Sequence, residues 1–267
     1  VPHGESATGD RSLHLSQSFF SALLDALQST HDIVPLEEAL AGAAGVPRRP
    51  RAVITFDDAY TGAVTAGFEE LEKRGLTATM FVPPGLLGGE GFWWDLVGET
   101  DGALRPDRRE FALDELEGRH SEVLAWARRQ NLPIRDLPEH ARPASAGQLV
   151  AAAKSARVSL SPHTWSHPNL ARLDPGEAWD EIDRSREWVS ESDADHGDWL
   201  AYPYGLWSEG VAEAVRDRMP GAVLVDGGLA RREGRSPPDT ALTPRTNVPR
   251  GLSLNGFLLR LSGLINS

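Results

Sequence analysis

Short apolar runs that alternate with amphipathic segments constrain the fold of this chain more than any other feature. Five runs have the length and apolar character of buried strands: 52–56, 77–82, 157–160, 199–202 and 222–225. Five segments have helical spacing of apolar residues: 16–27, 63–74, 175–190, 209–218 and 254–264. Alternation of this kind predicts a parallel sheet with helices outside it, either a barrel or a doubly wound sheet.

Polar residues follow several of these predicted strands. Asp57 and Asp58 come directly after the first strand, and His163 and Tyr204 come just after later ones. In both architectures, functional groups collect at the C-terminal ends of the strands. The coincidence favours a barrel with one shared site. We therefore expect an α/β fold, a distorted (β/α) barrel of about seven parallel strands.

Residues 86–146 interrupt the alternation. This segment opens near Phe92-Trp93-Trp94-Asp95, continues through a charged helix at about 109–130 and has few strand signals. We interpret it as a helical insertion over one side of the site. A chain of 267 residues suits one large domain, so a single domain over 1–267 is expected. The loop at 231–239 is the segment expected to be mobile.

His163 and His167 are the best candidates for metal ligands. Two imidazoles four residues apart can close on one ion if the turn between them is tight. A carboxylate from another strand would complete three protein ligands and leave a coordination position open, as a catalytic metal needs. The second residue of the Asp57–Asp58 pair would then be free as a base. Alone, the acidic pair is typical of a solvated turn or helix cap, so the combination carries the prediction of hydrolysis.

Composition excludes several classes of function. The chain has no cysteine, which excludes disulfides, thiol nucleophiles and cysteine zinc sites. Its net charge of −12 argues against nucleic acid or an anionic membrane as the main partner. No apolar stretch is long enough for a membrane span. No signal peptide is visible, which predicts a cytoplasmic protein, with secretion as the alternative if an N-terminal signal was removed.

Three blocks of the sequence resemble motifs of a known family and occur in the same order as in that family. They are Thr55-Phe56-Asp57-Asp58-Ala59-Tyr60, Ser161-Pro162-His163-Thr164-Trp165-Ser166-His167 and Tyr202-Pro203-Tyr204-Gly205. Together they resemble the polysaccharide deacetylases, the NodB-homology group called carbohydrate esterase family four. The resemblance covers most of the chain, while the insertion and the C-terminal part match loosely.

The resemblance implies a role for each matching residue. Asp57 would be the general base, and the backbone N–H of Tyr204 would help bind the oxyanion. The metal ligands would be Asp58, His163 and His167. The expected cofactor is a divalent metal, Zn²⁺ first, with Co²⁺ and Ni²⁺ as alternatives.

Two departures from the family pattern concern the base and its surroundings. The first block commonly ends Asp-Asp-Gly, and Ala59 replaces that glycine, which requires only a backbone conformation that alanine can adopt. The third block usually carries an arginine two residues before its proline, where this chain has Ala201. Such an arginine would hold the base ionised. Arg245 follows another predicted strand, and we hypothesise that it reaches the same place as a catalytic residue.

A third departure concerns delivery of a proton. The family usually supplies a late histidine as general acid, and this chain has no histidine after His196. The leaving amine would then take its proton from Asp57, from Asp226 or from water. General-acid help is worth about a hundred- to ten-thousand-fold, so its loss slows hydrolysis without forbidding it.

Aromatic residues near the site-forming segments suggest a sugar-shaped pocket. The chain has 8 tryptophans, although any one of them is more often a packing residue. We predict four substrate-binding residues: Trp94, Asp95, Trp165 and Tyr202.

The leading hypothesis is a metal-dependent deacetylase that acts on carbon–nitrogen bonds other than peptide bonds, removing an acyl group, acetyl first, from an amino sugar. Its substrate would be an oligosaccharide or an N-acylated small molecule. The alternatives are hydrolysis of another amide (N-formyl, cyclic imide or ureide), an inactive carbohydrate-binding relative, and an iron oxygenase, which also uses two histidines and a carboxylate. The intact base and ligands favour hydrolysis.

Overall fold

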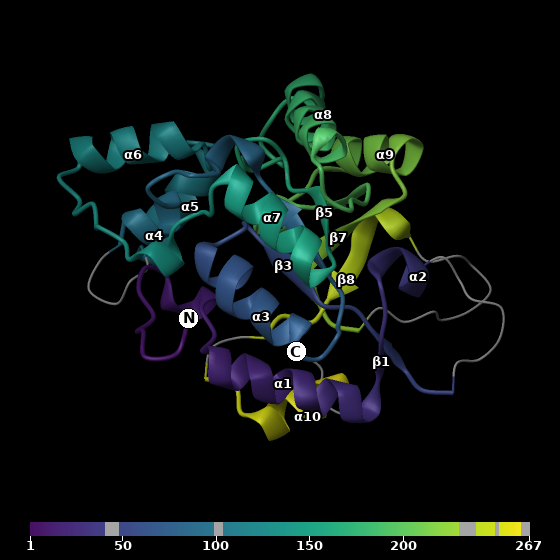
Figure 1. The fold of residues 1–267 in the computed structure, drawn as a ribbon. Coiled ribbons are helices and arrows are strands. Elements are labelled where there is room, and N and C mark those ends of the chain that lie inside the picture. The colour runs from purple at the N-terminus through teal and green to yellow at the C-terminus, as the bar shows by residue number, and fades with distance from the viewer. Residues whose placement is uncertain (41–47, 99–103, 230–238, 249–250, 263–267) are drawn as a thin grey trace.

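The computed structural model describes residues 1–40, 48–98, 104–229, 239–248 and 251–262 (Figure 1). Nearly all of the loop at 231–239 lies outside these ranges, and so does the side chain of Asp226. Among the described residues, no helix is long and apolar enough to cross a membrane.

All named strands pair in parallel, in three small sheets with the orders β1-β2, β3-β4-β5 and β6-β7-β8. The strands are β1 Asp32–Ile33, β2 Arg51–Ala52, β3 Thr55–Asp57, β4 Ala78–Val82, β5 Val158–Pro162, β6 Trp199–Ala201, β7 Gly221–Gly227 and β8 Thr243–Arg245. One run predicted as a single strand, 52–56, is divided between β2 and β3.

The parallel α/β class is confirmed, but a closed barrel of about seven strands is not shown by backbone pairing. A single parallel bridge from Leu160 of β5 to His196 lies between the two larger sheets. At the other end of the strand order, no backbone pairing joins β3 to β8 among the described strands. Among the described strands, the order therefore has an open seam between β3 and β8.

In the part of the chain that the structure describes, ten α-helices surround the sheets. They are α1 Gln17–Thr30, α2 Leu36–Leu40, α3 Phe68–Glu72, α4 Trp93–Leu96, α5 Pro106–Asp114, α6 His120–Arg129, α7 Ala146–Ala156, α8 Pro175–Glu191, α9 Glu209–Arg218 and α10 Leu254–Leu261. Side-chain caps fix several starts: Ser16 accepts from the N–H of Phe19 at α1, and Asp174 caps α8. The single helix predicted over 63–74 is instead a π-helix, Ala63–Gly67, followed by α3.

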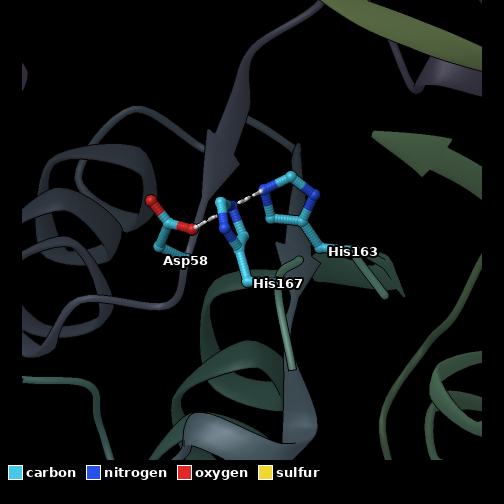
Figure 2. Close-up of side chains that lie close together, drawn as sticks. All are labelled: Asp58, His163 and His167. Atoms are coloured by element: carbon cyan, nitrogen blue, oxygen red, sulfur yellow. Dashed lines mark hydrogen bonds and ion pairs between the residues drawn. The ribbon is translucent and has the colours of Figure 1, made fainter. Parts of the chain in front are cut away.

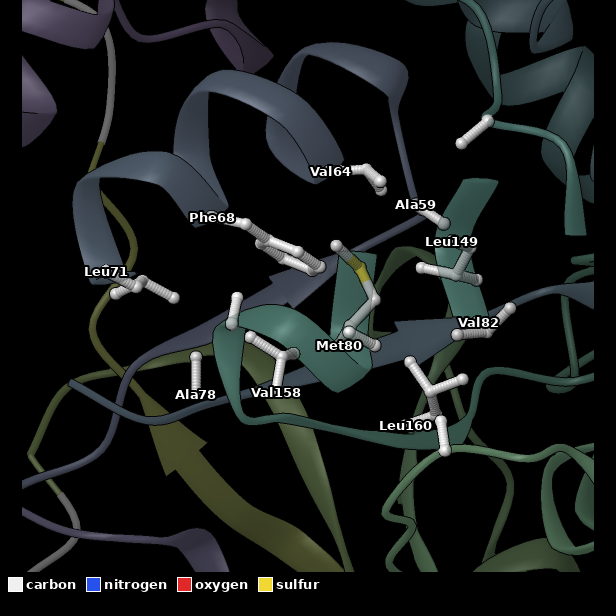
Figure 3. Packing of buried hydrophobic residues seen from close by; sticks show 14 of the residues in the cluster. Ala59, Val64, Phe68, Leu71, Ala78, Met80, Val82, Leu149, Val158 and Leu160 are labelled. Atoms are coloured by element: carbon white, nitrogen blue, oxygen red, sulfur yellow. The ribbon is translucent and has the colours of Figure 1, made fainter. Parts of the chain in front are cut away.

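The main core lies between the β3-β4-β5 sheet and the helices α3 and α7 (Figures 1 and 3). In Figure 3, Phe68 of α3 lies over Met80 of β4. The opposite face of β4 is also covered, because Phe81 packs with Trp199 and Val223 of the second large sheet. A strand buried on both faces is typical of parallel sheets, and it explains the unbroken apolar run of the sequence here.

The insertion has a hydrophobic core of its own. The helices α4, α5 and α6 lie together at one side of the molecule (Figure 1). They enclose a separate cluster of buried residues that includes Phe92, Trp93 and Trp94. Tyr60 and Tyr204, from the two larger sheets' strand ends, pack against this cluster. The segment 86–146 thus contains α4, α5 and α6, and its core includes rings that extend to Tyr60 and Tyr204.

Candidate active site

Asp58, His163 and His167 converge on one point at the C-terminal ends of β3 and β5 (Figure 2). The Oδ1 atom of Asp58 lies 3.3 Å from Nε2 of His167 and 3.6 Å from Nε2 of His163. The two Nε2 atoms are 3.2 Å apart. All three side chains are nearly buried, with 14% of Asp58 exposed and 4% or less of each histidine. The structure thus brings together the three predicted ligands.

The chemistry of these donors fits a divalent cation. Nδ1 of His163 lies 2.7 Å from the carbonyl of Ala201, so this nitrogen carries the proton and Nε2 presents a lone pair. Oδ1 of Asp58 is buried without a hydrogen-bond partner among the described residues. Three acceptor atoms this close repel one another, and a cation between them would satisfy all three. Two imidazoles and a carboxylate are a donor set that suits Zn²⁺.

The protonation states agree with such a site. Burial lowers the pKa of both His163 and His167, which keeps the imidazoles neutral, as ligands must be. Burial, together with the neighbouring Asp57 and Asp95, raises the pKa of Asp58 well above its ordinary value. A bound cation would offset that cost and keep Asp58 ionised.

The turn between the two histidines is held by side chains and backbone on both sides. Thr164 Oγ1 accepts a hydrogen bond from the N–H of His167 at 3.1 Å. Glu181 of α8 accepts from both the N–H and the hydroxyl of Ser166, at 2.7 and 2.9 Å. The N–H of Gly85 donates to the carbonyl of Trp165 at 2.8 Å. These contacts close the turn tightly enough for both imidazoles to face one point.

Asp57 forms a bidentate ion pair with Arg245, the last residue of β8. The two guanidinium nitrogens Nη1 and Nη2 donate to Oδ1 and Oδ2 at 2.8 and 2.7 Å. Burial alone would raise the pKa of Asp57, but the charge and hydrogen bonds of Arg245 bring it down to about 2. Asp57 is therefore ionised at neutral pH.

Arg245 reaches Asp57 across the open seam between β3 and β8. Its Nη1 also donates to the hydroxyl of Thr55 at 3.1 Å, and its Nε donates to the carbonyl of Leu224 in β7. The guanidinium lies 5.5 Å from the centre of the Phe81 ring. The contact hypothesised from the sequence is present, although its catalytic role remains a prediction.

Tyr204 lies in a 3-10 turn, Pro203–Gly205, after β6. Its ring meets that of His167 edge-on with centroids 4.6 Å apart, and its hydroxyl accepts from Nε1 of Trp93 at 2.8 Å. The first hydrogen bond of the turn runs from the N–H of Gly205 to the carbonyl of Tyr202, so the turn itself does not use the N–H of Tyr204. Its role as an oxyanion donor stays a prediction.

Strained backbone gathers around this site. Five non-glycine residues of the site segments have a left-handed backbone: Asp58 (φ 72°), Ala59 (φ 56°), Thr164 (φ 62°), His167 (φ 60°) and Tyr204 (φ 59°). Each such residue costs of order 1 kcal/mol or more and persists only where its surroundings fix it. Ala59 adopts the conformation that its family counterpart, glycine, takes readily.

The four predicted substrate residues lie in different settings. Trp165 is half-buried beneath the guanidinium of Arg184, 4.3 Å from its ring. Trp94, only 4% exposed, packs against the ring of His167. Asp95 and Tyr202 are fully buried. Asp95 accepts hydrogen bonds inside the fold, and Tyr202 packs in the core, so their burial argues against direct contact with substrate.

Sequence reasoning assigned no role to Tyr60 or Glu181 and placed Trp93 only near the site-forming segments, yet all three contact the site. Tyr60 belongs to the first of the three blocks and Trp93 adjoins Trp94, and that proximity was the signal available. Glu181 carries no local signal, because it looks like one more acidic residue on a solvated helix.

Comparison with known proteins assigns the family. Residues 44–218 match the family model described as polysaccharide deacetylase, which is more than half of the chain. The chain therefore belongs to the polysaccharide deacetylase family. No curated protein sequence matches it significantly.

Solved structures of similar fold include several deacetylases. The deacetylase PplD of Streptococcus pyogenes, in complex with acetate, is 17% identical with a TM-score of 0.65, covering 97% of this chain and 94% of that one. IcaB from Ammonifex degensii is 18% identical with a TM-score of 0.65, covering 96% and 92%. A de-N-acetylase from Aggregatibacter actinomycetemcomitans is 12% identical with a TM-score of 0.62, covering 97% and 96%. At such identities these likenesses show a shared fold.

Proposed function

We propose that this chain is a metal-dependent hydrolase that removes an N-acyl group, acetyl first, from an amino sugar or a sugar-containing small molecule. One observation carries the proposal. The converging atoms of Asp58, His163 and His167 lie beside Asp57, a carboxylate held ionised by Arg245. A metal site with an adjacent free base is what amide hydrolysis by an activated water requires. Membership of the polysaccharide deacetylase family supports the same reaction class.

Each residue of the site has a defined task in this reaction. When bound by Asp58, His163 and His167, a divalent metal polarises the acyl carbonyl and lowers the pKa of water. Asp57 accepts a proton at its carboxylate, and Arg245 keeps that carboxylate ionised and oriented. The N–H of Tyr204 donates to the negative charge that develops on the acyl oxygen, a contribution of a few kcal/mol.

Protonation of the leaving amine is the remaining step. The family's late histidine has no counterpart in the sequence, since none follows His196. Asp57 holds a proton after the first step and can return it to the amine nitrogen as the C–N bond breaks. A group that acts first as base and then as acid needs only to start ionised, so it predicts an acidic limb without the basic limb that a separate protonated acid would add.

The test compares wild type with Asp57→Asn and His163→Ala. Bound metal is measured first, and acyl release is then measured from a panel of N-acetyl and N-formyl amino sugars. We expect wild type to bind about one divalent ion per chain and to release acetate. We expect His163→Ala to lose metal, Asp57→Asn to keep it, and both variants to lose about a thousandfold or more in turnover.

The same measurements separate the alternatives. Metal bound by wild type with no release from any amide would favour a carbohydrate-binding relative. Turnover that requires iron and oxygen would replace the hydrolase with an oxygenase. Release of formate or opening of a cyclic imide, without acetate release, would keep the site but change the acyl group.

A further inference from the structure

The two candidate metal-ligand histidines are held in different ways. Nδ1 of His163 is fixed by the carbonyl of Ala201 in β6. Nδ1 of His167 has no partner of this kind among the described residues, although it is buried. A histidine ligand normally depends on such a hydrogen bond for its ring orientation. Something else must orient His167.

Aromatic rings surround His167 where the hydrogen bond is missing. The Trp94 ring lies 4.8 Å from it, and the Tyr204 ring lies 4.6 Å from it and edge-on. Trp94 is itself immobilised, because it stacks on Phe92 at 4.7 Å with an interplanar angle of 6°. Close packing on two sides restricts the rotation of the imidazole as a hydrogen bond would.

A buried chain of hydrogen bonds connects Trp94 to the turn after β3, which carries Asp58, another of the three candidate ligands. Nε1 of Trp94 donates to the hydroxyl of Tyr60 at 2.9 Å, and that hydroxyl donates to Oδ2 of Asp95 at 2.6 Å. Tyr60 follows Asp58 by two residues. Oδ1 of Asp95 accepts from the N–H of Asp10 at 2.7 Å and lies 3.5 Å from Nε2 of His14. Both carboxylate oxygens are therefore engaged inside the protein.

Trp93 connects the same segment to the Tyr204 turn. Its Nε1 donates to the Tyr204 hydroxyl at 2.8 Å, and only 1% of Trp93 is exposed. Tyr204 sits at φ 59°, so its turn needs support from its surroundings. The four residues from Phe92 to Asp95 thus contact Tyr60, His167 and Tyr204, one residue from each of the three site-forming blocks.

We propose that Phe92–Asp95 is a positioning platform for the site, in which Trp94 orients the His167 ring and Trp93 orients the Tyr204 turn. This rests on the proposed function, because it assigns His167 to a metal. It also gives Trp94 and Asp95 a role other than substrate contact. In this arrangement the insertion positions the residues that would hold the metal and does not itself supply a ligand.

The test measures Co²⁺ affinity and the visible spectrum of the Co²⁺-loaded protein, which reports ligand geometry without turnover. Trp94→Phe removes the N–H donor and half of the ring that faces His167. We expect it to weaken Co²⁺ binding by about tenfold or more and to shift the Co²⁺ bands. Tyr60→Phe removes a single hydroxyl from the same chain of hydrogen bonds and should change Co²⁺ binding in the same direction. It tests the proposal even if Trp94→Phe folds poorly.

Trp93→Phe tests the contact with the Tyr204 turn separately from the contact of Trp94 with His167. We expect Co²⁺ binding to stay within about twofold of wild type, because Trp94 still packs against His167. The loosened Tyr204 turn should lower kcat about tenfold with KM unchanged. Trp126→Phe is the matched control, since Trp126 packs in the same insertion core against Phe111, at 5.4 Å, without contacting the site residues. It should change neither quantity.

The outcomes distinguish this proposal from the proposed function. If wild type binds Co²⁺ and hydrolyses amides while Trp94→Phe and Tyr60→Phe match it in affinity and spectrum, the platform is wrong and the hydrolase stands. If wild type binds no metal at all, both are overturned. Equal effects of Trp126→Phe and Trp94→Phe would show general loosening of the insertion core and would also overturn the platform.

Discussion

The β3-β4-β5 sheet and the β6-β7-β8 sheet contribute different kinds of atoms to the same site. The first supplies the three ligand side chains and the base, at the ends of β3 and β5. The second supplies a carbonyl at Ala201, the backbone turn at Tyr204 and the guanidinium of Arg245. The first sheet carries the groups that react. The second sheet fixes their orientation and their protonation state. Substitutions in the second sheet should therefore reduce turnover without removing metal.

Arg245→Ala should have the largest effect among the substitutions that test this division between the two sheets. Without the guanidinium, burial raises the pKa of Asp57 from about 2, so the base becomes protonated at higher pH. We expect the acidic limb of the pH–rate profile to move to higher pH and kcat/KM at neutral pH to fall about 10- to 100-fold. Bound metal, measured on the same samples, should not change.

Arg245→Lys serves as its control. It keeps a positive charge but not the two parallel hydrogen bonds, so its acidic limb should lie between those of wild type and Arg245→Ala. An unchanged acidic limb with full activity in Arg245→Ala would contradict the role of Arg245. Loss of metal in that variant would break the division between the two sheets.

Glu70→Gln tests whether a loss of stability in α3, which covers the β3-β4-β5 sheet, leaves the site unaffected. Lys73 at 2.8 Å, together with Arg74 and Gln17, holds the pKa of this buried carboxylate at about 2. Since the folded pKa is depressed, the stabilisation is present above the ordinary value of about 4.3 and is lost as pH falls toward 2. We expect Glu70→Gln to lower the free energy of unfolding at pH 7 by about 2 kcal/mol, with metal binding unchanged.

The neighbouring Glu69→Gln is a matched control for this measurement. Glu69 also pairs with Lys73 at 2.8 Å, but its side chain is 56% exposed. Exposed pairs contribute little, so the free energy of unfolding should stay close to that of wild type. Denaturant titrations at pH 7 and pH 3 should show the Glu70 effect shrinking at the lower pH. An effect that grows at pH 3 would refute the assigned ion pairs.

Glu181→Gln should have the smallest effect, and it sharpens the comparison at the turn between the histidines. The amide oxygen can still accept from Ser166, but the two charge-assisted hydrogen bonds become neutral ones. We expect metal affinity to fall a few-fold, about 0.5–1 kcal/mol, with turnover at saturating metal nearly unchanged. Glu187→Gln, an exposed position of the same helix, should have no effect on metal titrations. Equal effects from both would remove the special role of Glu181.

The same division between sheets explains what the sequence could predict. Asp58 and His163 each follow an apolar run directly, and carboxyl ends of neighbouring parallel strands share one edge, so their convergence was foreseeable. Arg245 was foreseeable as a position after a strand, 188 residues from its partner in the chain. The open seam that it crosses was not, because strand periodicity gives no information on whether a barrel closes.

Burial of polar side chains was the other limit. Asp95 looks like a free carboxylate beside two tryptophans, but its partners are Tyr60 and the N–H of Asp10, 35 and 85 residues away in the chain. Tyr202 belongs to a recognised motif, yet its ring points into the core. The cover of Asp95 comes from Tyr60 and the N-terminal segment, and that of Tyr202 comes from α8 and α9. No local pattern in the sequence encodes that packing.

The left-handed residues at the site have a consequence for engineering. Glycine at Thr164 would relieve backbone strain and can raise the melting temperature, whereas glycine at Tyr204 would remove a ring packed against His167 and Trp94. The change at Thr164 would also free the backbone that aims the two histidines. A library selected by heat resistance alone would therefore accumulate glycine at Thr164 and lose activity. Selection on metal retention alongside heat resistance would preserve Thr164.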